Sequence, residues 1–322
     1  MKLDGENGVI QHFLMDVDNR LSDHSLVSYT HRLGVLARLL HDVCCVEDLE
    51  VVTVQHLRLC VQYLLNEPII GKSYRPLEDG KLSVSTVRGY IRVWKAFFNW
   101  CYQEELIDSS PVARLKPPKA SKHITPAFTT EHIEKMIASC DTSTDFGFRN
   151  YVVLLLLLDT GMRISEIATL KVEDVNFQSS CVKVFGKGRR EREIGIYPEM
   201  AKLLWKYIQK YRKSSNPDEH ALFIGHKGPI GVHGVNYIIK GIKSKSGLED
   251  IEFHAHVFRH TFAKMYLERG GEVFKLSREM GHSDVRITKI YLEDFGSTEA
   301  RRDHNSYSPL AGINLKNKNR KK

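Results

Sequence analysis

The stretch from Tyr151 to Glu166 reads Tyr-Val-Val-Leu-Leu-Leu-Leu-Leu-Asp-Thr-Gly-Met-Arg-Ile-Ser-Glu. Its apolar run is far shorter than the roughly 20 residues that a helix needs to cross a bilayer. The run therefore predicts a buried helix over about residues 146–159. The Thr-Gly pair that follows interrupts this helix, and a second helix is expected to open at Arg163.

Six polar side chains in the second half of the chain are the candidate functional site. They are Arg163, Lys187, His256, Arg259, His282 and Tyr291. Lys187 lies between two glycines, His256 and Arg259 share the motif His-Val-Phe-Arg-His, and Tyr291 follows His282 by nine residues. Any one of these motifs alone is weak evidence, but six in this order at workable spacing are hard to obtain by chance.

The order and context of these motifs closely resemble the catalytic signature of the tyrosine recombinases, the phage-integrase family of DNA strand-exchange enzymes. The resemblance covers about residues 128–295 by motif, and less specifically the helical region before them. It implies a mainly α-helical protein with a small antiparallel β-sheet and two domains. An N-terminal helical core-binding bundle of the SAM-like type and a C-terminal mixed α+β catalytic domain would close around a DNA duplex. Met280 and Phe258 stand where the family commonly has Leu, and both keep apolar bulk.

The residue types fit the cleavage of a DNA phosphodiester without a metal. Such a reaction requires charge on the non-bridging oxygens to be neutralised, a nucleophile to be aimed in line, and the leaving oxygen to receive a proton. Arg163 and Arg259 would neutralise the charge, because a guanidinium fork matches two phosphate oxygens and stays charged. Tyr291 would be the nucleophile, and its phenol, with an ordinary pKa of about 10, needs cations around it during attack.

The remaining members of the set are expected to handle protons and orientation. Lys187, at a hairpin tip, would protonate the departing 5′-oxygen, because its stem is long and its pKa can be lowered near other cations. His256 shares a helix face with Arg259 and would accept the phenol proton. His282 would donate a hydrogen bond to a phosphate oxygen. Glu166, three residues after Arg163, is expected to pair with it and orient the site.

Two plainer interpretations stay open at this point. The turn that carries Lys187 also carries Arg189, Arg190 and Arg192, so it could be a basic loop that only grips phosphate. The histidines at 254, 256 and 260 could instead be metal ligands, as in a hydrolase, although carboxylates or cysteines at ligand spacing are missing beside them. We expect no metal and no nucleotide cofactor, because strand exchange conserves the energy of the broken bond.

The N-terminal part of the chain predicts helices over about residues 25–41, 54–65 and 85–104. The last of these has an apolar stripe on one face and carries Arg88, Arg92 and Lys95 elsewhere. Charged faces of helices are usually only solvated. The functional alternative, of equal weight, is that this basic side lies along a DNA backbone.

Prolines and lysines around residues 108–126 predict a stiff, positive linker and the main domain boundary. We expect a DNA-binding domain over 1–117, a linker over 118–127, a catalytic domain over 128–313 and a basic tail over 314–322. Within the catalytic domain, helices are expected at about 131–139, 146–159, 199–213, 233–246, 256–269 and 272–280. Short strands are expected at about 175–177, 181–185 and 192–197, the last two flanking the glycines around Lys187.

The charge is unevenly distributed along the chain. Residues 1–120 carry 14 Lys and Arg against 15 Asp and Glu, whereas residues 121–322 carry 33 against 24. The positive excess thus lies in the part that holds the candidate site, where it would attract a polyanion. The six cysteines form no Cys-x-x-Cys pair and no secretory signal is visible, so a cytoplasmic location is expected.

By resemblance, the chain is expected to be a site-specific recombinase that integrates, excises or transposes a mobile element or resolves DNA molecules. Its partners would be double-stranded recombination sites, three further copies in a homo-tetramer on two DNA sites, and accessory DNA-bending proteins, with no membrane. The segment from Tyr307 to Ile313 is the candidate link to a neighbouring protomer, or else it folds back on its own domain. Two rivals are a type IB topoisomerase, which rejoins the same strand, and a catalytically silent DNA-binding relative.

Overall fold

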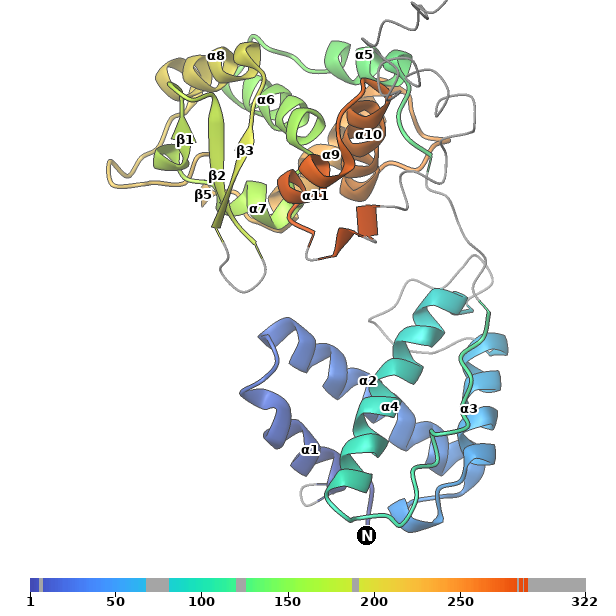
Figure 1. Ribbon diagram of the computed structural model, residues 1–322. Coiled ribbons are helices and arrows are strands. Elements are labelled where there is room, and N and C mark those ends of the chain that lie inside the picture. Colours follow the sequence, from blue (N-terminus) through green and yellow to red (C-terminus); the bar gives the residue numbers. More distant parts are fainter. Residues whose placement is uncertain are drawn as a thin grey trace, which may run out of the picture. The chain divides into compact units, whose positions relative to one another are not determined.

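The computed structural model describes residues 1–5, 8–67, 81–119, 126–186, 191–282, 284–285 and 287–288. The chain divides into two compact units, Met1–His123 and Ile124–Lys322 (Figure 1). Most of the expected linker, the hairpin tip at 187–190 and everything after residue 288 lie outside the described residues. The functional assignment of the two units stays a prediction.

The described part of the N-terminal unit is helical. Its helices are α1 (Val9–Asp18), α2 (Asp23–Cys44), α3 (Val54–Asn66) and α4 (Val84–Gln103), with a 3-10 turn at Leu49–Val51. Hydroxyl side chains cap the last three helices: Ser22, Thr53 and Ser83 each accept a backbone N–H three residues on. The three helices expected from the sequence are therefore confirmed. Helix α1 was not expected, because it is short and its N-cap, Gly8, has no side chain to mark the start.

Helix α4 is the centre of this unit. Tyr90, Trp94 and Phe97 are fully buried among side chains of the other helices, and the Trp94 indole donates to the carbonyl of Arg32 at 3.2 Å. Arg88 and Arg92 are exposed on the opposite side of α4, and Lys95 is half-buried. Helix α4 therefore has the apolar stripe and the basic side that its sequence predicted.

The C-terminal unit combines helices with small antiparallel sheets. Its helices are α5 (Thr130–Ala138), α6 (Asp145–Thr160), α7 (Ile164–Thr169), α8 (Pro198–Lys206), α9 (Val232–Ser246), α10 (Ala255–Glu268) and α11 (Val273–Glu279). The apolar run from Tyr151 to Leu158 lies in α6, where Val152, Leu154 and Leu156 are fully buried. Helix α10 packs directly against α6. These two helices form the middle of the unit and fix the positions of the segments at their ends (Figure 1).

The main sheet has three strands, β1 (Val175–Asn176), β2 (Cys181–Phe185) and β3 (Glu191–Gly195), in the order β1-β2-β3. Strands β2 and β3 are antiparallel, with Val184 opposite Arg192, so the expected pairing of the two strands is confirmed, whereas Lys187 itself lies outside the described residues. A second hairpin, β4 (Ile224–Gly225) with β5 (Gly228–Pro229), was not expected, because each strand has only two residues. A π-helical turn at Tyr207–Tyr211 extends α8.

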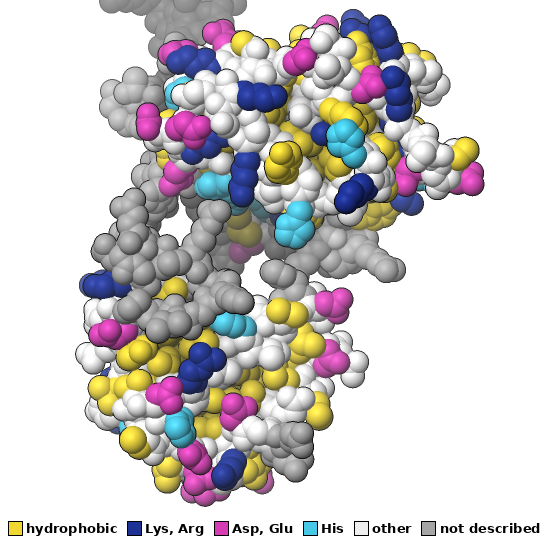
Figure 2. Space-filling model, turned by 180° about the vertical axis from the view of Figure 1, so that it is seen from behind, with side chains coloured by type: hydrophobic (Ala, Val, Ile, Leu, Met, Phe, Trp, Pro, Cys, Tyr) yellow, Lys and Arg dark blue, Asp and Glu magenta, His cyan; other side chains and the backbone are white. Residues whose placement is uncertain are grey.

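The fold class expected from the sequence is thus confirmed: mainly helical, with small antiparallel sheets. On the face seen in Figure 2, Lys and Arg side chains are spread over the C-terminal unit, with acidic side chains between them. Within the described ranges, no helix is long and apolar enough to cross a membrane.

Candidate active site

The first part of the site is the junction between α6 and α7. Gly161 ends α6 in the left-handed conformation, with φ +58°, and a Cβ there would lie 2.5 Å from the ring of Phe262. Only glycine fits this turn, because it has no Cβ to strain the backbone or to meet the ring. Arg163 is the N-cap of α7, and its side chain is 41% exposed. The turn therefore presents this guanidinium at the surface of the unit.

Glu166 lies in the first turn of α7 and is almost fully buried, with 4% of its surface exposed. Its Oε2 accepts the backbone N–H of Arg163 at 2.8 Å, and its Oε1 accepts Nη1 of Arg163 at 3.0 Å. The pair that the sequence predicted is therefore present. Its geometry holds both the backbone and the side chain of Arg163.

Arg192 is a second cation on the same carboxylate. From β3 it donates Nη1 to Oε1 of Glu166 at 2.9 Å and Nη2 to Oε2 at 3.1 Å. Only 14% of its side chain is exposed. The suggestion that Arg192 belongs to an exposed phosphate-gripping turn is therefore wrong, because the buried carboxylate of Glu166 draws it into the unit. Sequence reasoning missed the ion pair because its partners lie 26 residues apart.

The ionisation of Glu166 follows from these contacts. Burial by itself would raise the pKa of its carboxyl group. The hydrogen bonds from Arg192 and from the Arg163 backbone, together with the charges of both arginines, lower that pKa below its ordinary value. Glu166 is therefore a carboxylate at neutral pH, held between two guanidinium groups.

Helix α11 ends at the centre of the site, where three arginines from three elements bind its last carbonyl group and the two carbonyl groups that follow it. Arg192 Nε donates to the oxygen of Glu279 at 2.8 Å, Arg259 Nη2 to that of Met280 at 2.6 Å, and Arg163 Nη2 to that of Gly281 at 3.4 Å. The last carbonyls of a helix lack partners within it and form its negative end, so cations are favoured there. The C-terminus of α11 thus brings Arg163 and Arg259 to adjacent residues.

Arg259, on α10, is 4% exposed and is fixed at several points. Besides its bond to Met280, its Nη1 donates to the carbonyl of Gly161 at 2.8 Å, and its Nη2 lies 2.8 Å from Nε2 of His282. Because a guanidinium can only donate, Nε2 of His282 is the acceptor. The proton of the neutral imidazole is then on Nδ1, which lies 2.8 Å from the hydroxyl of buried Thr288.

The two histidines of the set are both neutral at pH 7. Burial, followed by the charges of Arg259, Arg163 and Arg192, lowers the pKa of His282 to about 4. For His256, at the start of α10, desolvation and then the charge of Arg259 lower the pKa below its ordinary value. His256 is an exposed residue one helical turn before Arg259, on the same face of α10.

The structure brings together Arg163, Glu166, Arg259 and His282, and it places His256 on the Arg259 face of α10. Lys187, Arg189, Arg190 and Tyr291 lie outside the described residues. Arg88, Arg92 and Lys95 belong to the other unit. In the parts of the chain that are described, no three His, Cys, Asp or Glu side chains are grouped to hold a metal.

Known proteins resemble this chain over most of its length. The profile of the phage integrase family matches residues 126–296. Tyrosine recombinase XerD of Halalkalibacterium halodurans is 30% identical over 233 residues, 71% of this chain and 77% of that protein. Tyrosine recombinase XerC of Bacillus licheniformis is 27% identical over 303 residues, 92% of this chain and 94% of that protein.

Solved structures share the fold. The Tn1549 transposon integrase in complex with circular intermediate DNA superposes with a TM-score of 0.74 at 18% identity, covering 92% of this chain and 98% of that one. A lambda integrase dimer bound to a COC′ core site gives a TM-score of 0.67 at 17% identity, covering 87% and 95%. With the family profile and the recombinase relatives, these findings make the chain a member of the phage integrase family, the tyrosine site-specific DNA recombinases.

Proposed function

We propose that this recombinase cuts DNA with Tyr291, at a phosphate held by Arg163 and Arg259. The observation that carries the proposal is the convergence of both arginines on the turn after α11, at Met280 and Gly281, ten to eleven residues before Tyr291 in the sequence. Arg163 is half exposed, so its fork can reach a phosphate oxygen. Arg259 donates to the carbonyl groups of Gly161 and Met280, which hold its guanidinium group in a fixed orientation before DNA binds.

Proton transfer in the proposed reaction uses His256 and Lys187. His256 is neutral and exposed, so it can accept the proton that the Tyr291 phenol loses on attack. Lys187 would give a proton to the departing 5′-oxygen. The hairpin that carries Lys187 has its base beside the site, because Arg192 of β3 is bound to Glu166.

His282 has a different role in the proposal, that of a donor to a phosphate oxygen. Without DNA its Nε2 accepts from Arg259, so donation requires a proton on that nitrogen. A phosphate close to the ring favours this proton, because a nearby negative charge raises the pKa of an imidazole. Binding of the phosphate and protonation of His282 would therefore support each other.

The reaction balances without a nucleotide. The Tyr291 oxygen forms a bond to phosphorus and the bond to the 5′-oxygen breaks, which leaves a 3′-phosphotyrosyl link and a 5′-hydroxyl group. A 5′-hydroxyl from the partner duplex then attacks the link and releases the phenol. This exchange would integrate, excise or transpose a mobile element or resolve DNA molecules, in the cytoplasm. Arg88, Arg92 and Lys95 of α4, with Arg189 and Arg190, would grip the DNA backbone.

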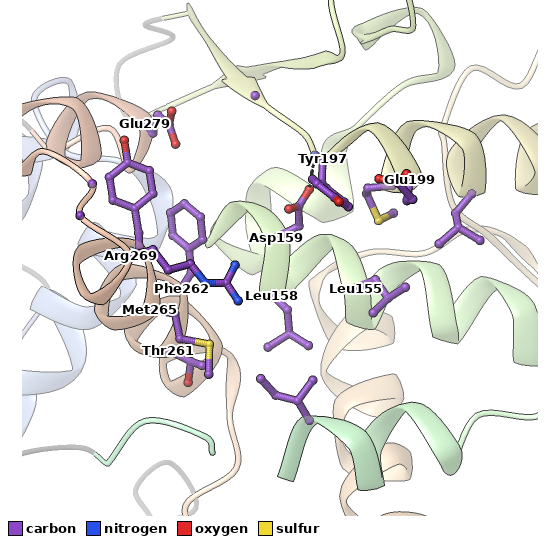
Figure 3. Close-up of a pocket in the computed structure, with 17 residues that line it drawn as sticks. Leu155, Leu158, Asp159, Tyr197, Glu199, Thr261, Phe262, Met265, Arg269 and Glu279 are labelled. Carbon is purple, nitrogen blue, oxygen red and sulfur yellow. Dashed lines mark hydrogen bonds between the residues drawn. The ribbon is translucent and has the colours of Figure 1, made fainter. Parts of the chain in front are cut away.

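We further propose that four copies assemble on two DNA sites, aided by accessory DNA-bending proteins, and that the segment Tyr307–Ile313 joins neighbours. The C-terminal unit has a cavity of about 730 Å³ that could receive such a segment. Leu155 and Leu158 of α6 line it together with Phe262 and Met265 of α10 (Figure 3). An apolar segment with Leu310 and Ile313 suits such a lining.

The cavity also favours a positive charge beside the apolar segment. Asp159 and Glu279 both line it, and burial raises the pKa of each, with the negative charge of Asp159 adding to the effect on Glu279. Arg269 also lines the cavity, and a further cation near both carboxylates would favour their charged forms. Lys316, three residues after Ile313, could supply it.

The test of the proposed function uses duplex DNA selected by the protein from a random-sequence pool. A nick beside the cleavage point lets the leaving fragment escape, so the covalent protein–DNA adduct accumulates. The wild type is expected to form the adduct, whereas Tyr291→Phe should bind the same duplex equally well and form none. An adduct in Tyr291→Phe would refute the nucleophile. Specific binding without an adduct in the wild type would favour a silent relative, and relaxed plasmid without recombinants would favour a topoisomerase.

A further inference from the structure

Glu166 is shared between two arginines, although one would be enough to satisfy its charge. Both of its oxygens accept one donor from Arg163 and one from Arg192. The pairing with Arg192 is bidentate, the strong fork-to-carboxylate geometry. The Arg163 side chain, in contrast, donates to Glu166 only through Nη1. Its Nη2 donates instead to the carbonyl of Gly281 at 3.4 Å.

This asymmetry has an electrostatic consequence. A buried carboxylate close to Arg163 would cancel much of the positive charge that a DNA phosphate needs there. Arg192 supplies the second positive charge, so the three groups together keep one net positive charge. That charge lies on the side of Arg163, which is 41% exposed, and not on Arg192, which is 14% exposed.

We propose that Arg192 is a positioning residue that balances Glu166 and so leaves the charge of Arg163 available to the scissile phosphate. It does so without touching DNA, because its guanidinium is enclosed between Glu166 and the end of α11. A Cβ on Gly281 would lie only 2.8 Å from its Cζ. The inference rests on the proposed function of Arg163.

Arg192 also links three elements of the site. It belongs to β3, it binds Glu166 of α7, and its Nε holds the carbonyl of Glu279 at the end of α11. A lysine would keep the charge, but it has no planar fork with which to bind the carboxylate and the carbonyl at once. The charge of Arg192 balances Glu166, and its planar shape lets it bind the carboxylate and the carbonyl together. Variants that keep only the charge, or neither, can separate these two contributions.

The experiment measures single-turnover adduct formation and duplex affinity, with full-length protein and the nicked selected duplex described above. Arg192→Gln should lower the rate of adduct formation about 10-fold to 10²-fold, with a change in affinity of no more than about threefold. Arg192→Lys should recover part of the rate. The matched control is Arg212→Gln, because Arg212 is a half-buried arginine of the same unit that donates to carbonyl groups of Glu219 and Ala221. This control should keep the wild-type rate.

The double variant Glu166→Gln/Arg192→Gln separates charge balance from damage to the fold. In Arg192→Gln the carboxylate of Glu166 has only Arg163 to neutralise it. Removal of that carboxylate should free Arg163, so the double variant should form adduct faster than Arg192→Gln alone. A double variant that is as slow as Arg192→Gln, or slower, overturns the proposal.

A second substrate tests the same point at the phosphate. A methylphosphonate at the scissile position has a methyl group in place of one non-bridging oxygen and is uncharged, so its cleavage depends less on the charge of Arg163. The rate defect of Arg192→Gln should shrink on this substrate, whereas an equal defect on both substrates would indicate general damage and refute charge balance. If the wild type forms no adduct with either substrate, the proposed function fails. If the wild type reacts and Arg192→Gln reacts equally fast, only the role of Arg192 fails.

Discussion

Replacement of Gly281 by alanine tests how tightly the turn after α11 is built against Arg192. Gly281 has φ +64°, and an added Cβ would lie 2.8 Å from Cζ and Nη1 of Arg192 and 2.9 Å from its Nε. The left-handed backbone alone costs an alanine about 1–2 kcal/mol. Arg192 cannot swing aside freely, because its bonds to Glu166 and Glu279 hold the guanidinium. Loss of one such charged hydrogen bond costs about 1.5–3 kcal/mol more.

Gly281→Ala should therefore lower the free energy of unfolding of the C-terminal unit by about 2.5–5 kcal/mol. Gly247→Ala is the matched control, because Gly247 has φ +67° and an added Cβ would meet nothing within 4 Å. It should lose only the backbone cost of about 1–2 kcal/mol. Urea unfolding measures the loss of unfolding free energy in both variants. Hydrogen exchange of peptides from β2 and β3 identifies which transition belongs to the C-terminal unit. Equal losses in the two variants would refute the close packing of Gly281 on Arg192.

Three further predictions concern the site and the assembly. Arg163→Ala or Arg259→Ala should slow adduct formation about 10²-fold or more, and a loss of only a few-fold would contradict the phosphate clamp. His282 should contribute stability that is present above its unfolded pKa of 6.5 and lost as pH falls toward its folded pKa of about 4. The urea midpoint of the wild type should thus fall more between these pH values than that of His282→Gln; parallel curves would argue against a neutral, buried His282. Deletion of residues 306–322 should preserve adduct formation but prevent tetramers on two DNA sites, as measured by sedimentation, and intact tetramers would exclude this segment as the link.

The sequence predicted most elements whose signals are local. Ser22 and Thr129 are hydroxyl residues of the kind that favours a helix start, and each caps the helix that follows it. The apolar stripe of α4 and the apolar run of α6 predicted burial correctly. Apolar residues in such patterns are buried in the core whichever elements pack against them. Helix α1 and the β4–β5 hairpin were missed, because they are short and are held by contacts with other elements rather than by their own pattern.

The site could be predicted only in part, for the same reason. Glu166 lies three residues from Arg163, so helical spacing was enough to predict their pair. Arg192 and Glu166 meet only because β3, α7 and α11 converge, and no spacing in the sequence records that. The neutral state of His282 likewise depends on its burial, and then on three arginines that folding brings near it. The roles of Lys187 and Tyr291 stay predictions.

A structure of the protein trapped covalently on its nicked duplex would show which residue attacks the DNA and which arginines hold the phosphate. We expect a bond from the Tyr291 oxygen to a phosphorus whose non-bridging oxygens accept hydrogen bonds from both Arg163 and Arg259, at about 2.7–2.9 Å. Guanidinium groups that bind different phosphates, or a DNA link on another residue, would contradict it.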